Sequence, residues 1–287
     1  MDSVEPVFNP SHPIKTIAVA VSFSPYCQSV LSEANYLSDV LNATLLLIHV
    51  GEKTANKEQE VNEMILQLKI DPHRSPIIWA EEGAEAKTIL ELCDKNKVDL
   101  LVLGARVKEN MFKFYIGSIA RKISRKAKCS VMLVTSPAIA PHQYNRIVIN
   151  GADNPKTENT IDTAFYFAEH LKTKEVYIVQ ELDVNLSLIS DAQVNTLKQQ
   201  KELQTNDSLI RSIIKKHQGK DFQIINKTVK GKTGYAVKKF AQTKKADLLV
   251  INSPDIQLNV MDRIFTHDME YILANLPCNL LIVHPRV

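Results

Sequence analysis

Two short segments of this sequence place glycine and serine where they could bind phosphate. Gly104 directly follows the apolar run of residues 98–103, and Gly117 and Ser118 stand immediately before a predicted basic helix over residues 119–128. Backbone N–H groups at a helix N-terminus, the positive end of the helix dipole and a serine hydroxyl all favour the oxygens of an anion. A glycine and a serine before a helix can equally form an ordinary N-terminal cap. The segment therefore predicts either an anion site or a simple helix start.

The segments that must position these residues alternate between short apolar runs and amphipathic stretches. The runs are rich in β-branched residues and do not alternate with polar ones, as expected of strands buried on both faces of a parallel sheet. In the first half of the chain they occupy residues 16–21, 44–50, 76–80, 98–103 and 130–135. Between the first two runs, four apolar residues recur at the spacing of one helix face: Val30, Ala34, Leu37 and Leu41. The order predicts a right-handed, doubly wound α/β sheet with a ligand crevice at the carboxyl ends of its strands.

The sequence contains an internal duplication. Residues 99–104 read DLLVLG and residues 247–252 read DLLVIN, an offset of 148. Gly83 and Gly231 precede these two segments by the same 16 positions. A repeat of this length predicts two copies of one fold in tandem.

We place the two predicted domains at residues 1–137 and 144–287, on either side of a short linker that contains Pro141. The apolar runs that open the two copies are only 130 residues apart, so the second copy holds about 18 extra residues. The polar stretch over residues 185–218 is the simplest place for this insertion.

The composition excludes several classes of protein. The chain has 287 residues, of which only 8 are glycine, and this rules out collagen-like and glycine-rich low-complexity sequences. The formal net charge of +3 is too small to indicate a nucleic-acid or membrane partner, and no apolar run approaches the roughly 18 residues of a membrane span. The four cysteines have neither the spacing of metal ligands nor that of a C-x-x-C pair: Cys27, Cys93, Cys129 and Cys278. We therefore expect reduced thiols, no bound metal and a cytoplasmic protein.

The loop from Gly104 to Ser118 resembles the signature of the universal stress protein family, G-x2-G-x9-G-[ST]. Gly104, Gly117 and Ser118 match three of its positions, and Val107 stands where the second glycine would be. The resemblance extends over almost the whole chain, in a tandem two-domain form. It implies two Rossmann-like domains of the adenine nucleotide alpha hydrolase-like type, each with a five-stranded parallel-type sheet flanked by helices.

The resemblance also implies a nucleotide site in the first domain. In family members that bind ATP, the glycines of this loop hold the triphosphate and an Asp at the end of the first strand contacts the nucleoside. Gly104, Gly117 and Ser118 would then contact phosphate. Ser22 stands in place of the Asp and offers no carboxylate, and Val107 is poorly suited to a positive φ or to close phosphate approach. We therefore expect a weakened site for ATP or AMP.

The second copy departs further from this pattern. Residues 252–255 read NSPD where the first glycine segment would be, and Thr266 and His267 replace the glycine and serine before the helix. We predict that this copy does not bind nucleotide. His267, Asp268 and Glu270 are interpreted as a solvated helix face and not as a metal site.

The resemblance implies a non-catalytic, cytoplasmic regulator of the stress response. Residues 130–135 and 279–284, the final strands of the two copies, would pair within the chain as a pseudo-dimer; a homodimer and an unidentified protein partner stay open. One alternative is a nucleotide-free interaction scaffold that acts through the aromatic loop 111–115 or the insertion 185–218. That loop could pack over a ligand or against the other domain.

The other alternative is an enzyme of a related α/β nucleotide-binding class. Such enzymes need an H-I-G-H or S-G-G-x-D-S element, and the sequence contains neither. No nucleophile, base and orienting group can be aligned. We expect no enzyme, although weak ATP hydrolysis stays open. His49, which closes an apolar run, is expected to bond to backbone.

Overall fold

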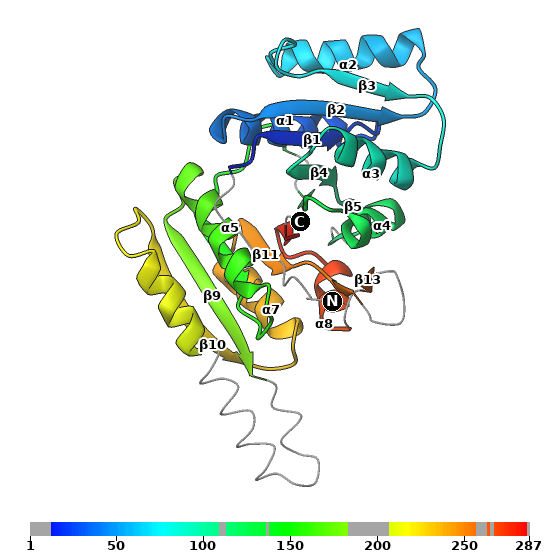
Figure 1. Cartoon of the computed structure of the whole chain (residues 1–287). Coiled ribbons are helices and arrows are strands. Elements are labelled where there is room, and N and C mark those ends of the chain that lie inside the picture. The colour runs from blue at the N-terminus through cyan, green and yellow to red at the C-terminus, as the bar shows by residue number, and fades with distance from the viewer. Residues whose placement is uncertain are drawn as a thin grey trace, which may run out of the picture.

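The structure is a computed structural model that describes residues 13–108, 113–135, 138–182, 207–256, 263–264 and 267–285. Ten strands form one sheet in the order β10-β9-β8-β11-β14-β7-β4-β1-β2-β3 (Figure 1). In chain order these strands are β1 (Thr16–Ala20), β2 (Thr44–Val50), β3 (Ile77–Ala80), β4 (Leu100–Gly104), β7 (Ser130–Val134), β8 (Arg146–Asn150), β9 (Glu175–Leu182), β10 (Gln223–Lys230), β11 (Leu248–Asn252) and β14 (Asn279–Val283). Two further pairs are β5 (Arg106–Lys108) with β6 (Lys113–Tyr115), and β12 (Asp255–Ile256) with β13 (Arg263–Ile264).

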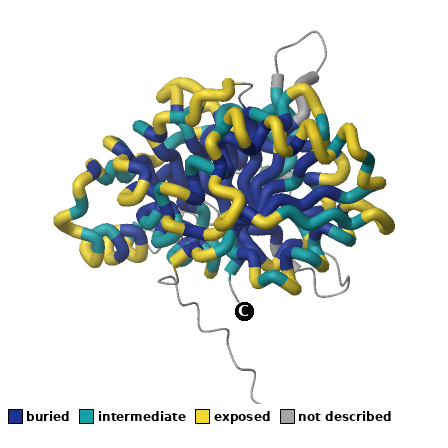
Figure 2. The backbone as a smooth tube through the Cα atoms, turned by 90° about the horizontal axis from the view of Figure 1, so that it is seen from above, coloured by how far each residue is buried: buried dark blue, intermediate teal, exposed yellow. Residues whose placement is uncertain are grey.

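Helices cover both faces of the sheet. Their bounds are α1 (Cys27–Val40), α2 (Ala55–Gln67), α3 (Glu85–Lys95), α4 (Ser118–Lys126), α5 (Thr157–His170), α7 (Tyr235–Lys244) and α8 (His267–Leu273), with a further helical segment over 207–216. Side chains of α1, α2, α5 and the 207–216 segment join one apolar core, and those of α3, α4, α7 and α8 join a second. Figure 2 shows these buried residues concentrated in the interior, with exposed residues on the outer helices and loops. Among the described residues, no helix combines the length and apolarity that crossing a membrane requires.

The predicted α/β fold is confirmed. The five apolar runs of the first half are strands β1, β2, β3, β4 and β7, which pair in parallel in the order β3-β2-β1-β4-β7. The second half repeats this order as β10-β9-β8-β11-β14, also in parallel. In both halves, unalternating apolar strands lie between two layers of helices, as their sequences require.

The duplicated residues have the same local structure in both halves. The Asp99 carboxylate accepts hydrogen bonds from the backbone N–H groups of Lys15 and Thr16, at 2.6 and 3.0 Å, where the first strand begins. Asp247 does the same for the N–H of Arg146 at 2.8 Å. The turn glycines also match, since Gly83 has φ +118° and Gly231 has φ +147°. An L-residue rarely adopts either value, so the glycines are required by the turn.

The sheets of the two halves are joined by an antiparallel strand pair. Strand β7 lies beside β14, with Leu133 opposite Leu280 and Val131 opposite Ile282. Arg121 on α4 forms an ion pair with Glu270 on α8, across the same junction. All other neighbouring strands of the ten-stranded sheet are parallel, so the direction of the sheet reverses here.

A buried polar network fastens the linker to both halves. The Glu33 carboxylate, on α1, accepts a hydrogen bond from the Tyr144 hydroxyl at 2.5 Å and lies 2.8 Å from Nδ1 of His142. The Tyr144 hydroxyl in turn accepts from Nδ2 of Asn279 on β14 at 3.1 Å, and Oδ1 of Asn279 accepts from the backbone N–H of Thr135 at 2.8 Å. Helix α1, the linker and the last strands of both halves are therefore joined by one chain of hydrogen bonds.

The linker network predicts a pH dependence of stability. The hydrogen bond to Glu33 raises the pKa of His142, with a smaller contribution from Asp247. A raised folded-state pKa adds stability below the unfolded value of about 6.5, and this stability is lost as the pH rises through the folded-state pKa. We expect the urea midpoint to fall between about pH 6 and about pH 9, and His142→Gln to reduce that fall. If the urea midpoint fell equally in the unaltered protein and in His142→Gln, the pH dependence would come from other groups.

Candidate functional site

The predicted site lies at the topological switch point of the first half. Strand β1 has β2 on one side and β4 on the other. The order in which the chain adds strands to the sheet therefore reverses direction at β1. This is the place where an open α/β sheet forms a ligand crevice. Ser22 follows β1 and Gly104 ends β4, so the parallel sheet brings both residues to its carboxyl edge. Helix α4 begins after the β5–β6 hairpin, at Gly117 and Ser118.

The start of α4 has the form of an anion site. Gly117 is the N-cap residue, and because it has no side chain it makes no capping hydrogen bond to the first turn of the helix. Ser118 is the first helical residue, and its side chain is exposed. The hydroxyl therefore does not cap the helix, and the first-turn N–H groups point towards the carboxyl edge with the positive end of the helix dipole.

Gly104 has a packing reason to be glycine. A Cβ built on this residue would lie 3.0 Å from Cγ2 of Val30 on α1, a distance tighter than side chains normally tolerate. The end of β4 therefore lies close to α1, and any larger residue at position 104 would require the Val30 side chain to shift. Its backbone is exposed at this point, which leaves it accessible to a ligand.

The loop between Gly104 and Gly117 is attached to the second half of the chain. Val107 lies in β5, opposite Phe114 of β6; the side chain of Val107 and the residues Met111 and Phe112 lie outside the described part. The backbone C=O of Phe114 accepts from the N–H of Leu276 at 2.9 Å, and the N–H of Ile116 donates to Leu273 at 3.1 Å. The Phe114 ring packs into the core on the α4 side. Phe114 therefore packs against the other half. The sequence left open whether this loop packs over a ligand or against the other domain, and for Phe114 the second alternative holds.

A cluster of aromatic rings beside Ser22 was not predicted as part of the site. Phe23 follows β1, His49 lies near the end of β2 and Trp79 near the end of β3. The Phe23 and Trp79 rings are roughly parallel, 6.4 Å apart, and the His49 ring meets both edge-on at 4.8 and 5.1 Å. The ammonium groups of Lys53 and Lys57 lie 5.6 Å from the Trp79 ring centre and 6.0 Å from that of Phe23.

Two features of this cluster are typical of functional sites. Phe23 has φ +50°, a conformation that costs energy for a bulky residue. His49 bonds through Nδ1 to the carbonyl of Val21 at 2.9 Å, as predicted, but its buried Nε2 has no hydrogen-bond partner among the described residues. A sequence signal was available, since an aromatic ring lies close to the carboxyl end of three successive strands, and one of these residues is the single Trp of the chain.

The equivalent crevice of the second half is occupied by its own side chains. The Lys156 ammonium donates to the carbonyl oxygens of Ser253 and Pro254 at 3.0 and 3.1 Å, where the first glycine segment would begin. Thr160 donates to Oδ1 of Asn252 at 2.5 Å, and Nδ2 of Asn252 donates to Thr157 at 3.2 Å. These hydrogen bonds join α5 to the end of β11.

In the described part of the chain no cluster of side chains is suited to metal binding, and the thiol beside the crevice is not activated. No three His, Cys, Asp or Glu side chains there could hold a metal ion. Burial raises the pKa of the Cys27 thiol beside the crevice, so this group stays protonated and is a poor nucleophile. Glu270, considered above for a metal, forms an ion pair with Arg121 instead.

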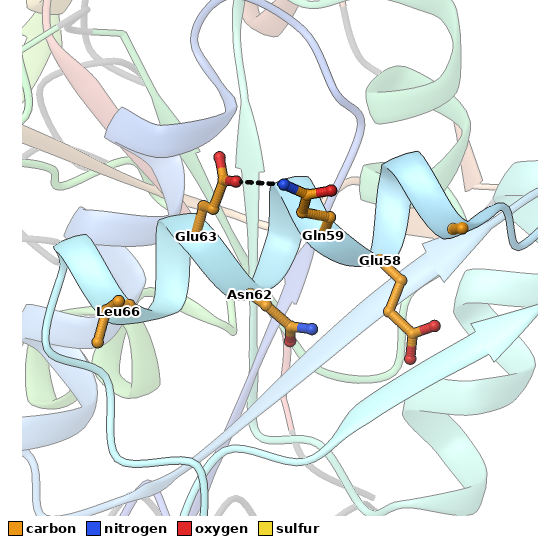
Figure 3. A pocket seen from close by; sticks show the side chains of 6 residues that line it. Glu58, Gln59, Asn62, Glu63 and Leu66 are labelled. Carbon is orange, nitrogen blue, oxygen red and sulfur yellow. Dashed lines mark hydrogen bonds between the residues drawn. The ribbon is translucent and has the colours of Figure 1, made fainter.

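A surface hollow of about 440 Å³ lies away from this edge, on the outer face of α2. Figure 3 shows the side chains that line it, with Gln59 donating to Glu63 on one side of the helix and Glu58, Asn62 and Leu66 on the other. It is lined by one helix and contains none of the predicted site residues.

Comparison with known proteins agrees with the loop motif. Residues 51–135 match the universal stress protein family. A universal stress protein of Methanocaldococcus jannaschii is 36% identical over 56 residues, which cover 20% of this chain and 33% of that relative. Residues 51–135 therefore form a universal stress protein domain.

Two longer matches describe how the family fold is distributed along the chain. Universal stress protein A homolog 1 of Coxiella burnetii is 27% identical over 141 residues, covering 42% of this chain and 95% of that protein. The crystal structure of a universal stress protein from Archaeoglobus fulgidus matches with a TM-score of 0.67 and 12% identity, covering 96% of this chain and 100% of that one. The second match shows the fold alone and extends over both halves.

Proposed function

We propose that this chain is a tandem member of the universal stress protein family, with domains at residues 1–137 and 144–287 that form an internal pseudo-dimer. The identical strand order of the two halves and the β7–β14 junction support this proposal. Less than half of the chain covers nearly the whole Coxiella burnetii relative, which is the proportion expected of a duplicated protein. The family match supports a cytoplasmic regulator that acts without catalysis.

The first domain is proposed to bind ATP or AMP weakly. The observation that carries this proposal is the start of α4, which lacks a side-chain cap at its N-cap residue and lies at the same carboxyl edge of the sheet as the basic and aromatic cluster. Phosphate would contact the N–H groups and hydroxyl at Gly117 and Ser118, with Gly104 leaving room for its approach. The base would lie on the side of Phe23 and Trp79, because stacking on aromatic rings favours a purine.

The second domain is proposed to stay free of nucleotide. Lys156 places its ammonium group on the carbonyl oxygens of the loop that would otherwise approach phosphate, and Pro254 lacks the N–H that a phosphate loop needs. Its role is then structural, because it supports the β5–β6 hairpin through Leu273 and Leu276.

Calorimetric titration of the full chain with ATP and with AMP tests the nucleotide proposal. We expect saturable binding with a dissociation constant in the range of about 10 μM to 1 mM, and a loss of at least about tenfold in Ser118→Asp. The new carboxylate suits the first turn of α4 electrostatically, so the helix should stay folded while the carboxylate repels phosphate.

The matched control is Asn159→Asp, which adds the same charge to the first turn of α5 in the second half. It should bind nucleotide like the unaltered protein. Heat indistinguishable from buffer with both nucleotides, at several hundred micromolar protein, would favour the nucleotide-free scaffold.

A further inference from the structure

Two buried cysteines of the first half lie in contact at the amino edge of the sheet, opposite the carboxyl edge of the proposed nucleotide site. Cys93 is in the last turn of α3 and Cys129 is in the short connection between α4 and β7, and they are 4% and 5% exposed. The Cys93 thiol donates a hydrogen bond to the sulfur of Cys129. The two residues are 36 positions apart in the sequence, so the fold brings the thiols together.

Two further contacts join the segments that carry these cysteines. The Lys128 ammonium, directly before the second cysteine, lies 2.8 Å from the carboxylate of Asp94, directly after the first. The backbone N–H of Ser130 donates to the C=O of Asp99 at 3.1 Å, where β7 and β4 begin side by side. The ion pair is exposed and contributes little energy, but both contacts place the α4–β7 connection beside the end of α3 and the start of β4. The thiols therefore meet in a well-defined part of the fold.

The second copy keeps only one of the two thiols. By the spacing of the internal repeat, Cys278 occupies the position of Cys129, and Ala241 occupies that of Cys93. Both residues of the second copy pack in the same apolar core as the two cysteines of the first. Alanine therefore satisfies the packing where the first copy has Cys93. Packing alone does not account for the pair of thiols in the first copy.

We propose that Cys93 and Cys129 form an oxidation site, at which hydrogen peroxide converts the two thiols into an intramolecular disulfide. The thiolate of one cysteine attacks a peroxide oxygen, the O–O bond breaks, and a sulfenic acid and one water form. The thiolate of the other cysteine attacks the sulfenic sulfur, the S–S bond forms, the S–O bond breaks and a second water leaves. The two sulfurs lose two electrons to the peroxide, and the two thiol protons end in the two waters.

The surroundings of the pair determine how readily it reacts. The hydrogen bond to Cys129 and burial both raise the pKa of the Cys93 thiol. Because the thiolate is the reactive form, the pair reacts slowly and needs an excess of peroxide. Burial also raises the pKa of the Cys27 and Cys278 thiols, and neither has a second cysteine beside it within the described residues. A disulfide is therefore expected at the first pair alone.

The disulfide encloses the segment that presents the proposed phosphate loop. The ring contains residues 94–128, a stretch of 35 residues that includes β4, β5, β6 and α4. A cross-link of this kind stabilises a protein mainly by restricting its unfolded chain. Oxidation should therefore make the first half harder to unfold. The oxidation site does not depend on nucleotide binding, because it lies at the other edge of the sheet.

Thiol titration and peptide mapping of the full chain test this proposal. The reduced protein is treated with hydrogen peroxide, the excess is removed, and the remaining thiols are titrated after unfolding in urea. Two of the four thiols should be lost, and dithiothreitol should restore them. In a sample alkylated during unfolding to prevent thiol exchange, mass spectrometry should find the peptides of Cys93 and Cys129 joined, with the loss of two hydrogen atoms.

Urea unfolding of the oxidised protein measures the effect of the cross-link. Closing a ring of this size should lower the unfolding equilibrium constant at least about tenfold, which raises the urea midpoint by about 0.5 M. Cys93→Ala and Cys129→Ala should show no rise after the same treatment. Each variant is compared with its own reduced form, so a lower starting stability does not affect the result. Alanine is a suitable replacement because Ala241 fills the equivalent position of the second copy.

Cys278→Ala is the matched control. It removes the equivalent thiol of the second copy and should leave both the disulfide and the rise in urea midpoint unchanged. Three results would overturn the proposal: four free thiols after peroxide treatment, loss of thiols without a disulfide between Cys93 and Cys129, or such a disulfide with no rise in the urea midpoint.

Discussion

Replacing Glu33 with alanine is expected to lower the free energy of unfolding by about 3 kcal/mol. Glu33 is only 2% exposed, and its carboxylate accepts from the Tyr144 hydroxyl and contacts the imidazole of His142. Truncation removes the acceptor of a fully buried hydroxyl and leaves unfilled space on the inner face of α1. Because Tyr144 also binds Asn279 on β14, the loss should extend to the junction between the two halves.

Urea unfolding at about pH 7 measures this loss, and Tyr144→Phe gives an independent variant of the same network. Tyr144→Phe keeps the ring and leaves Glu33 and Asn279 each without one partner, so we expect a smaller loss of about 1–2 kcal/mol. Glu60→Ala, an exposed truncation on α2, should change stability by less than about 0.5 kcal/mol. If Glu33→Ala cost less than about 1 kcal/mol, water could replace the network and the linker would not be fastened by it.

The fold could be predicted from the sequence because its signals are local. An apolar run such as residues 98–103 needs only its own residue types to indicate a strand buried on both faces, and the duplication then supplies the second half. Gly83 and Gly231 were matched by spacing before their positive φ angles were known. The linker network could not be predicted, because it joins Glu33 to Tyr144 and Asn279 over more than 100 positions, and a glutamate in an amphipathic helix normally faces water.

The candidate site was predicted only in part, for the same reason. Residues around the loop motif could be placed because the motif has fixed spacing. The ring cluster was missed because Phe23 and Trp79 come together only when three strand ends meet, and neither belongs to a motif. Lys156 was missed because a lysine before a helix resembles a solvated residue until its ammonium is seen on two backbone carbonyls. The net charge of +3 gave no sign of the uneven distribution of charge along the chain, because it averages positive and negative segments.

Restoring the family's acidic residue at the end of β1, by Ser22→Asp, is expected to raise the affinity for ATP and AMP by about 10- to 100-fold. Ser22 is exposed and its hydroxyl bonds only to that of Ser24 at 3.1 Å among the described residues, so the larger side chain meets no steric obstacle. A carboxylate that accepts from ribose hydroxyls forms charge-assisted hydrogen bonds worth about 1.5–3 kcal/mol, which corresponds to that range of affinity. Lys53 and Lys57 in the neighbouring cluster reduce the repulsion between the new carboxylate and a bound phosphate.

Titration calorimetry of Ser22→Asp, alone and combined with Val107→Gly, measures the gain. Val107→Gly should add to it, because glycine lets the β5 backbone approach phosphate more closely. Ser24→Asp is the matched control, since it adds the same charge to the same exposed loop two residues beyond the strand end, and it should leave the affinity unchanged. An equal gain in Ser24→Asp would mean that charge alone strengthens binding, whereas no gain in Ser22→Asp would mean that the nucleoside does not lie at the end of β1. A gain in affinity confined to Ser22→Asp would place the ribose at the switch point between β1 and β4. This is the carboxyl edge of the sheet, where the sequence predicted the ligand crevice.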